Sequence, residues 1–418
     1  MEEWKEFRLG DVCTITSSKR IFANEYQNYG IPFYRGKEII EKQKGEKVSN
    51  ELFISKDKYD DIKKKYGVPS EGDMLLTSVG TIGIPYIVQD EIFYFKDGNL
   101  TWFQNFNGIN NRFLYYWFFT PFAKSLIDSK AIGSTQKALT IDTLKKFEIK
   151  LPSINEQKRI VSILKSLDDK IENNRKINEN LEQQAQALFK SWFVDFEPFR
   201  DQPFVESELG MIPQSLTIKR ISELPHILET GRRPKGGVGE LNQGIPSVGA
   251  EHVKGLGNYD FSKTKYITEE YANSLKTGKI NGYELLIYKD GGKPGYFIPN
   301  YSIFGEGYPF DECYLNEHVF KLDFSNKGFN AFCYFYFQSD YVMHYLNSQG
   351  SKAAIPGINR QDIETIPIYS PENVIVYKFC DWVLPLIKTI LTNSVESRRL
   401  SHLRDTLLPK LMSGEIKL

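Results

Sequence analysis

The chain has 418 residues, with 53 basic and 53 acidic side chains and therefore no formal net charge. This length predicts two or three domains, and 41% hydrophobic with 25% charged residues is typical of a folded globular protein. Zero net charge argues against a histone-like protein that attracts nucleic acid by bulk charge. Four cysteines without a CxxC pair, and a charged N-terminal segment in place of a signal peptide, favour the cytoplasm.

The first 153 residues alternate short β-like runs with helical stretches. Runs rich in aliphatic and aromatic residues predict strands at 74–78, 85–89 and 92–95. The aromatic run 113–119 predicts a buried helix, because a base-stacking role is the less common use of such a run. Another strand is predicted at 284–288, so the second half has the same mixed character.

Two long helices are predicted, the first from Asn155 to about Phe193 and the second from about Glu372 to Leu408. Apolar residues recur in both at steps of three and four, and 155–193 contains no proline or glycine. Each apolar stripe turns polar midway, at Asn174 in the first helix and at Asn393 in the second. We expect the two helices to pack on each other in antiparallel fashion, with packing of each on its own domain as the alternative.

An internal repeat organises the chain. Five segments recur in the same order at an offset of about 210–219 residues. They include GIPFYRGKEI from Gly30 with GIPSVGAEHV from Gly244, GDMLLTSVGTIG from Gly72 with GYELLIYKDGGKPG from Gly282, and GSTQKALTIDTLKKF from Gly133 with GSKAAIPGINRQDIE from Gly350. The predicted domains are 1–153 and 201–371, each followed by a long helical segment, 154–200 and 372–418.

Several motifs resemble those of the DNA specificity subunit of Type I restriction–modification systems. They are LPSINEQKRIVSILKSLDDKIENN from Leu151, LFKSWFVDFEPF from Leu188, GSTQKALT from Gly133 and LRDTLLPKLMSGEI from Leu403. The resemblance covers essentially the whole chain. It implies an α+β fold with two globular target recognition domains, separated by two long antiparallel helices that form a coiled-coil-like rod, and an internal pseudo-two-fold duplication.

The resemblance also implies a function without catalysis in this chain. Each recognition domain would recognise one half of a bipartite, asymmetric DNA site, and the helices would set the half-site spacing and dock partner subunits. The partners would be two modification subunits that bind S-adenosylmethionine and methylate adenine, and optionally two restriction subunits that use ATP and Mg. No cofactor or metal is expected in this chain, which has no GxxxxGK[ST] or Asn-Pro-Pro motif.

Basic, Gly-rich and polar loops are the candidate DNA contacts, because phosphate contacts position a protein and base-edge contacts specify sequence. Residues 1–153 carry 22 basic and 20 acidic side chains, whereas 201–372 carry 16 and 21, so the second domain must concentrate its positive charge. The candidates are Lys19, Arg20, Arg35, Lys37, Thr77, Ser78, Thr81, Ser134, Thr135, Gln136 and Lys137 in the first half, and Arg232, Arg233, Lys235, Glu251, His252, Lys289, Lys293, Ser351 and Lys352 in the second. Ordinary solvated turns remain the alternative for these loops.

Apolar residues near the helix ends are candidates for docking the partner subunits. They are Trp192, Phe193, Phe196, Leu407, Leu408 and Leu411. Two other functional classes stay open at this point. One is a duplicated enzyme that modifies or cleaves DNA on its own, and the other is a scaffold that tethers partners without contacting DNA.

Overall fold

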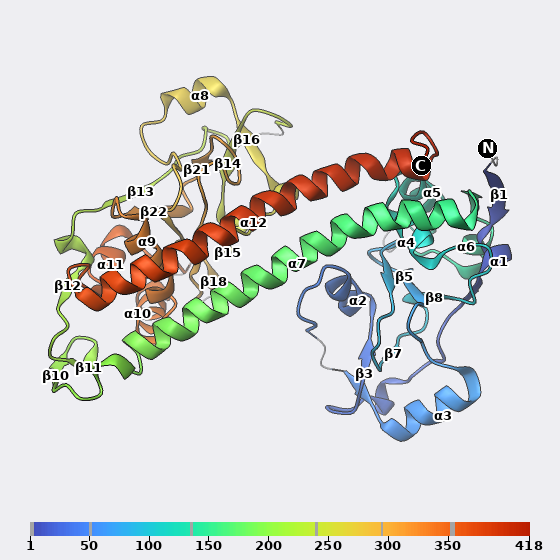
Figure 1. Cartoon of the computed structure of the whole chain (residues 1–418), viewed down its shortest axis with the longest axis horizontal. Coiled ribbons are helices and arrows are strands. Elements are labelled where there is room, and N and C mark those ends of the chain that lie inside the picture. The colour runs from blue at the N-terminus through green and yellow to red at the C-terminus, as the bar shows by residue number, and fades with distance from the viewer. Residues whose placement is uncertain (1–3, 50–51, 134–136, 239–240, 294–295, 352–355) are drawn as a thin grey trace. The chain divides into compact units, whose positions relative to one another are not determined.

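In the computed structural model, the described residues are 4–49, 52–133, 137–238, 241–293, 296–351 and 356–418. They belong to two compact units (Figure 1): unit 1 comprises Met1–Glu172 and Leu400–Leu418, and unit 2 comprises Asn173–Arg399. Both units mix helices and strands, which confirms the α+β prediction. None of the helices in the described ranges combines the length and apolar character of a membrane span.

Unit 1 is built on an antiparallel sheet of order β2-β8-β5-β6, with strands at Thr14–Thr16, Leu100–Gln104, Met74–Thr77 and Pro85–Ile87. A second sheet has the order β4-β3-β7, with strands at Phe53–Ile54, Ile31–Tyr34 and Tyr94–Phe95. Within it β3 is parallel to β7 and antiparallel to β4. A third, two-stranded sheet pairs β1 (Lys5–Arg8) with β9 (Glu148–Leu151). The strands predicted at 74–78, 85–89 and 92–95 are thus present with slightly shorter bounds.

The short helices of unit 1 are α1 (Leu9–Val12), α2 (Gly36–Gln43), α3 (Lys56–Tyr66), α4 (Asn111–Phe119), α5 (Pro121–Lys130) and α6 (Ile141–Lys145), with a 3₁₀ turn at Ala23–Glu25. Side-chain oxygens of Asn110 and Thr120 cap α4 and α5. The aromatic residues of α4 are largely buried, which confirms that the run is part of the core.

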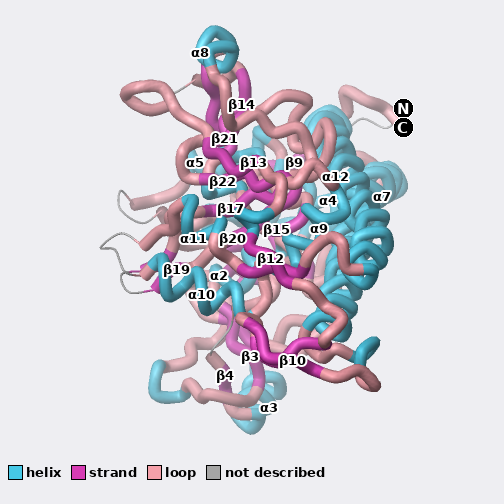
Figure 2. The backbone as a smooth tube through the Cα atoms, turned by 90° about the vertical axis from the view of Figure 1, so that its left-hand side faces the viewer, coloured by secondary structure: helices cyan, strands magenta, loops and turns pink. Residues whose placement is uncertain are grey.

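Unit 2 has a five-stranded sheet of order β13-β22-β17-β20-β15, with strands at Ile227–Thr230, Val319–Asp323, Leu285–Tyr288, Asn300–Ile303 and Gly255–Leu256. A three-stranded sheet has the order β16-β14-β21, at Lys265–Ile267, Ile245–Val248 and Tyr314–Leu315. Figure 2 shows β14 beside β21, and these two strands are parallel. Smaller antiparallel pairs are β12 (Ile218–Arg220) with β23 (Pro367–Tyr369), β10 (Phe204–Ser207) with β11 (Gly210–Pro213), and β18 (Gly292–Lys293) with β19 (Tyr296–Phe297).

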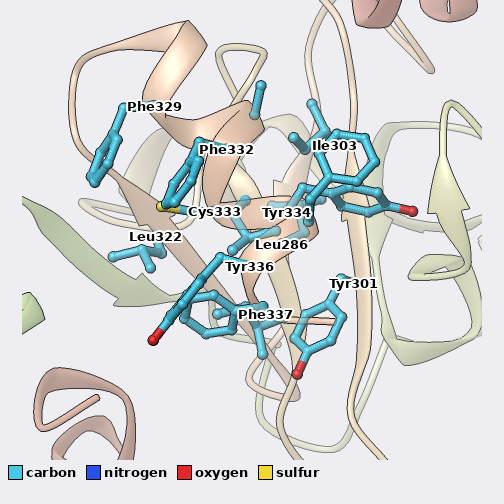
Figure 3. Close-up of a cluster of buried hydrophobic side chains, with 14 of the residues drawn as sticks. Leu286, Tyr301, Ile303, Leu322, Phe329, Phe332, Cys333, Tyr334, Tyr336 and Phe337 are labelled. Carbon is cyan, nitrogen blue, oxygen red and sulfur yellow. The ribbon is translucent and has the colours of Figure 1, made fainter. Parts of the chain in front are cut away.

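The core of unit 2 forms where α9 (Lys327–Tyr336) covers the five-stranded sheet. Figure 3 shows Phe332 and Cys333 of α9 near Leu286 of β17 and Leu322 of β22, and all four side chains are fully buried. The other short helices are α8 (Glu269–Ser274), α10 (Asp340–Gly350) and α11 (Arg360–Glu364), with 3₁₀ turns at Glu197–Phe199, Ile221–Glu223, Ala250–His252 and Phe261–Lys263.

The two long helices are α7 (Ile154–Phe193) and α12 (Val374–Met412). The second continues four residues beyond the predicted end at Leu408. Within unit 2, Asn174 Nδ2 donates to Glu396 Oε2 at 2.7 Å, while Phe189 stacks edge-on with Phe379 at 5.7 Å between ring centroids. Residue numbers rise along one helix as they fall along the other, so the pairing is antiparallel. In unit 1, Asp168 and Arg404 continue it with an ion pair of 2.8 Å.

The order of strands is duplicated between the units. The sheets β2-β8-β5-β6 and β4-β3-β7 of unit 1 correspond to β13-β22-β17-β20 and β16-β14-β21 of unit 2. Gly30 and Gly244 precede equivalent strands with φ of 129° and 140°, and a Cβ on either would lie 2.4 or 2.5 Å from a carbonyl oxygen of the neighbouring strand, that of Ile54 or Ile267. Only glycine satisfies that approach, so the repeated Gly-Ile-Pro motif has a structural cause.

The strand register corrects one part of the sequence alignment by a residue. Thr77 pairs with Leu100 in unit 1, and Tyr288 pairs with Val319 in unit 2. Counting back from these pairs places Gly72 opposite Tyr283, not Gly282, and both residues have positive φ, 87° and 71°. The sequence alignment pairs Gly72 with Gly282 because both residues are glycine, whereas the backbone hydrogen bonds between strands pair Gly72 with Tyr283.

Candidate DNA-binding surface

In unit 1, several candidate loops meet at one end of the strands of the main sheet. Antiparallel pairing puts the C-terminal ends of β2 and β5 beside the N-terminal end of β8. The loop before β8 joins them, because Ser78 N donates to Asn99 O at 2.8 Å and Arg20 Nε donates to Asp97 Oδ2 at 2.9 Å. The loop carrying Lys137 joins as well, since Gly80 N donates to Lys137 O at 3.1 Å. Segments far apart in sequence therefore form one surface.

Unit 2 brings the equivalent loops together by the same hydrogen bonds. Lys289 N donates to His318 O at 3.1 Å, and Ile358 N donates to Lys289 O at 2.9 Å. The first bond corresponds to the one from Ser78 N to Asn99 O in unit 1. The second corresponds to the one from Leu139 N to Ser78 O, which also measures 2.9 Å. Arg233 reaches the same loop through Glu317, with Nε 2.5 Å from Oε1. The surface is thus present once in each unit.

A turn after β3 and β14 borders each surface and is closed by a different side chain. Glu38 Oε2 accepts from Arg35 N at 2.8 Å, and His252 Nδ1 accepts from Gly249 N at 3.2 Å. These bonds show that Lys37 corresponds to Glu251 and Glu38 to His252, as the alignment of Gly30 with Gly244 predicts. Both capping side chains are fully buried.

The two caps have shifted ionisation. Burial acts to raise the pKa of Glu38, but hydrogen bonds from the Arg35 side chain and from backbone amides outweigh it and leave the pKa low. Burial lowers the pKa of His252; the negative charges of Glu251 and Asp260 oppose this effect, and Lys254 and Lys265 add to it. The carboxylate and the neutral imidazole are therefore the forms that accept the hydrogen bonds.

The candidate residues differ in solvent exposure. Exposed ones are Lys19, Arg20, Lys37, Thr81, Lys137, Arg232, Arg233 and Lys235, and half-buried ones are Arg35, Glu251, Lys289 and Ser351. Thr77, Ser78 and His252 are buried, and the hydroxyls serve the loop itself: Thr77 Oγ1 accepts from Ile84 N and Ser78 Oγ bonds Thr101 Oγ1. Ser134, Thr135, Gln136, Lys352 and the side chain of Lys293 lie outside the described residues.

Two residues at these surfaces were missed by sequence reasoning. Neither Asp97 nor Glu317 is among the sequence candidates, yet each binds an arginine of the candidate loops. Aligning the repeat through the strands that flank them would have paired these acids. Within the described ranges, no three His, Cys, Asp or Glu side chains gather as a metal site would require.

Comparison with known proteins decides the family. The profile of the Type I restriction modification DNA specificity domain matches residues 1–183. The MjaIX specificity subunit of Methanocaldococcus jannaschii is 31% identical over 359 residues, covering 83% of this chain and 78% of that protein. The chain belongs to the Type I restriction enzyme specificity subunits. A HindI specificity subunit from Haemophilus influenzae is 26% identical over the full length of both proteins, 100% of each.

A solved structure supports the fold. The S subunit of a Type I restriction–modification system from M. genitalium matches with a TM-score of 0.58 and 16% identity, over 98% of this chain and 96% of that one. As a specificity subunit, the chain supplies DNA specificity to a complex with other subunits, and catalysis is not its own part. This outcome confirms the family and the general role inferred from the motifs.

The docking candidates of this specificity subunit are used mostly inside their own units. Phe193 is buried in unit 2 against Phe332 and Phe379, and Trp192 is partly buried beside Phe379. Phe196 lies over Phe204 at 5.7 Å between ring centroids. In unit 1, Leu408 and Leu411 belong to the core, and Leu407 packs against it. Phe193, Leu408 and Leu411 are thus covered by the chain itself, whereas the other three candidates are only half-buried. A docking role for these residues stays a prediction.

Proposed function

We propose that each unit recognises one half of a bipartite, asymmetric DNA site through the loop surface described above. The observation that carries this proposal is that the same convergence of loops occurs twice in one chain. Side chains at equivalent positions differ, as with the exposed Lys37 of unit 1 and the half-buried Glu251 of unit 2. Equal backbone frameworks with different side chains suit two half-sites of different sequence.

The recognition domains in this proposal are 1–153 and 201–371, and α7 and α12 set the spacing between half-sites. Two modification subunits that bind S-adenosylmethionine and methylate adenine complete the methyltransferase, in the cytoplasm. Two restriction subunits that use ATP and Mg join it for cleavage. Adenine methylation requires the base to leave the helical stack, so each half-site contains an adenine on one strand that a partner flips out.

A domain exchange tests this proposal. Replacing residues 1–153 by those of a relative with a different target is expected to change one half-site of the methylated motif and to leave the other half-site and the spacing unchanged. Sequencing of methylated adenines in a genome that carries the hybrid with its partner subunits measures this. The matched control exchanges 201–371 and should change only the other half-site. Alteration of both half-sites by either exchange would contradict the assignment of one half-site to each domain.

A further inference from the structure

An arginine–carboxylate pair occupies the same place in both units. Thr16 of β2 pairs with Trp102, and Glu229 of β13 pairs with Lys321, so Arg20 and Arg233 both lie four residues beyond equivalent strand positions. The acids follow equivalent strands too, because Asp97 lies two residues after β7 and Glu317 two residues after β21. Strand register alone therefore makes Arg20–Asp97 and Arg233–Glu317 equivalent; we name them the two clamps.

Each clamp holds its arginine side-on. The contact is made by Nε, at 2.9 Å in unit 1 and 2.5 Å in unit 2. The arginine side chains are nevertheless 69% and 49% exposed. A guanidinium has five N–H donors in a rigid fork, so a contact through Nε restrains its plane and leaves the N–H groups of the terminal amino groups available to another acceptor.

The backbone under each clamp is fixed by different means. In unit 1, Ser18 Oγ donates to Phe95 O at 2.8 Å, and Lys19 N donates to Tyr94 Oη at 2.7 Å. In unit 2, Gly231 replaces the serine and lies so close to β21 that a Cβ would stand 1.6 Å from Leu315 O. The supporting contacts have diverged between the units, whereas the clamp itself is present in both.

Stability does not explain why both units have the clamp, because exposed ion pairs contribute little to folding. A neighbouring position that meets solvent has diverged between the units, because the exposed Lys37 of unit 1 corresponds to the half-buried Glu251 of unit 2. A residue that is the same in two units recognising different sequences must contact what the two half-sites share, and that is the sugar–phosphate backbone.

We propose that Arg20 and Arg233, each oriented by its carboxylate, bind a DNA phosphate at the same place on each half-site and so set the register of the unit on the duplex. This inference rests on the proposed function. The carboxylate is a positioning group that keeps the guanidinium in place. Because its negative charge cancels the positive charge of the arginine, it also weakens the electrostatic attraction of the arginine for phosphate. The clamp therefore gives orientation at the expense of bulk affinity.

The experiment uses the full complex with its modification subunits and measures DNA binding over a salt series. Arg20→Gln is expected to weaken binding about ten-fold and to reduce the salt slope by about one unit, equally for matched and mismatched half-sites. The methylated motif stays the same. Arg20→Lys, which keeps the charge and loses the fork, recovers part of the affinity. Lys64→Gln is the matched control, because it removes one exposed positive charge from α3. It should change the DNA affinity and the salt slope much less than Arg20→Gln does.

A second variant separates a phosphate contact from a merely structural pair. Asp97→Asn keeps an acceptor oxygen and removes the negative charge, so DNA affinity should rise and its salt slope should steepen. Unchanged binding by both Arg20→Gln and Asp97→Asn, in complexes with normal melting temperatures, would overturn the proposal. A changed base within one half-site would overturn it as well, since Arg20 would then contact a base. If the wild-type complex showed no sequence-specific binding, the proposed function would fail instead.

Discussion

Unit 1 and unit 2 share their strand pairing but differ in the side chains that hold equivalent backbone positions. Asp73 of unit 1 accepts from Trp102 Nε1 at 2.9 Å, whereas the equivalent Glu284 lies 4.0 Å from the buried Lys321. A buried glutamate closes one turn and a buried histidine closes its counterpart. The backbone requires an acceptor at each place, and the chemistry of that acceptor is free to vary. Divergence has therefore changed charge and hydrogen bonding while leaving topology intact.

The largest expected effect tests whether the units unfold separately. Phe113 and Phe332 are both fully buried and lie seven residues before equivalent helix caps, Thr120 and Ser339. Either change to alanine should cost about 3–5 kcal/mol of unfolding free energy through the cavity it leaves. Amide hydrogen exchange should report faster opening of β5 for Phe113→Ala and of β17 for Phe332→Ala.

The exposed Phe122 serves as the control, since its change to alanine removes an aromatic ring of the same size from solvent rather than from the core. If either core variant loosened β5 and β17 alike, the two units would form a single cooperative unit. The comparison between them would then describe topology but not independent stability.

The next effect comes from Lys321 and its two carboxylate neighbours in unit 2, at the position that Trp102 occupies in unit 1. Lys321 is almost fully buried, with Nζ 2.8 Å from Glu229 Oε1 and 4.0 Å from Glu284 Oε1. Lys321→Met should cost about 3 kcal/mol, because two carboxylates lose their cation. The unit 1 counterpart, Trp102→Phe, loses one hydrogen bond and should cost about 1–2 kcal/mol.

Urea unfolding monitored by hydrogen exchange in β17 and β5 measures both changes. Adding Glu229→Gln to Lys321→Met should restore part of the loss, since one uncompensated charge is removed. A double variant no more stable than the single one would show that the packing of the lysine stem, and not its charge, matters at this site.

The smallest expected effect is a difference in pH response between the two turn caps. His252 has a pKa below its ordinary 6.5, so the unfolded chain takes up a proton more readily, and the stability of unit 2 falls as the pH drops below that value. Glu38 has a pKa below its ordinary 4.5, so its contribution to unit 1 is kept above that pH and is lost in stronger acid.

Unfolding measured from pH 7 downward should thus weaken unit 2 before unit 1. The difference between wild type and His252→Gln isolates the contribution of this histidine from those of others in unit 2. If the stability of His252→Gln fell with decreasing pH as steeply as that of the wild type, groups other than His252 would cause the pH response.

Sequence reasoning predicted the duplication, both long helices and the mixed fold, because helical periodicity and the Gly-Ile-Pro repeat reflect local geometry. It did not find the clamps. Asp97 and Arg20 are 77 positions apart in sequence, and only the parallel pairing of β3 with β7 and the antiparallel pairing of β2 with β8 bring their loops together. Thr77 and Ser78 looked accessible in a Gly-rich loop, yet their hydroxyls are buried in hydrogen bonds that close it.

The division of α12 between the units has a consequence for synthesis. Unit 1 includes residues 400–418, and Leu408, Leu411 and Met412 fill its core beside Ile160 and Leu164. These residues leave the ribosome only after the whole of unit 2 has been made. The unit that is translated first is therefore completed last, and until then the apolar face of the first part of α7 has no partner from α12. That face therefore stays exposed on the nascent chain until the end of α12 has been synthesised.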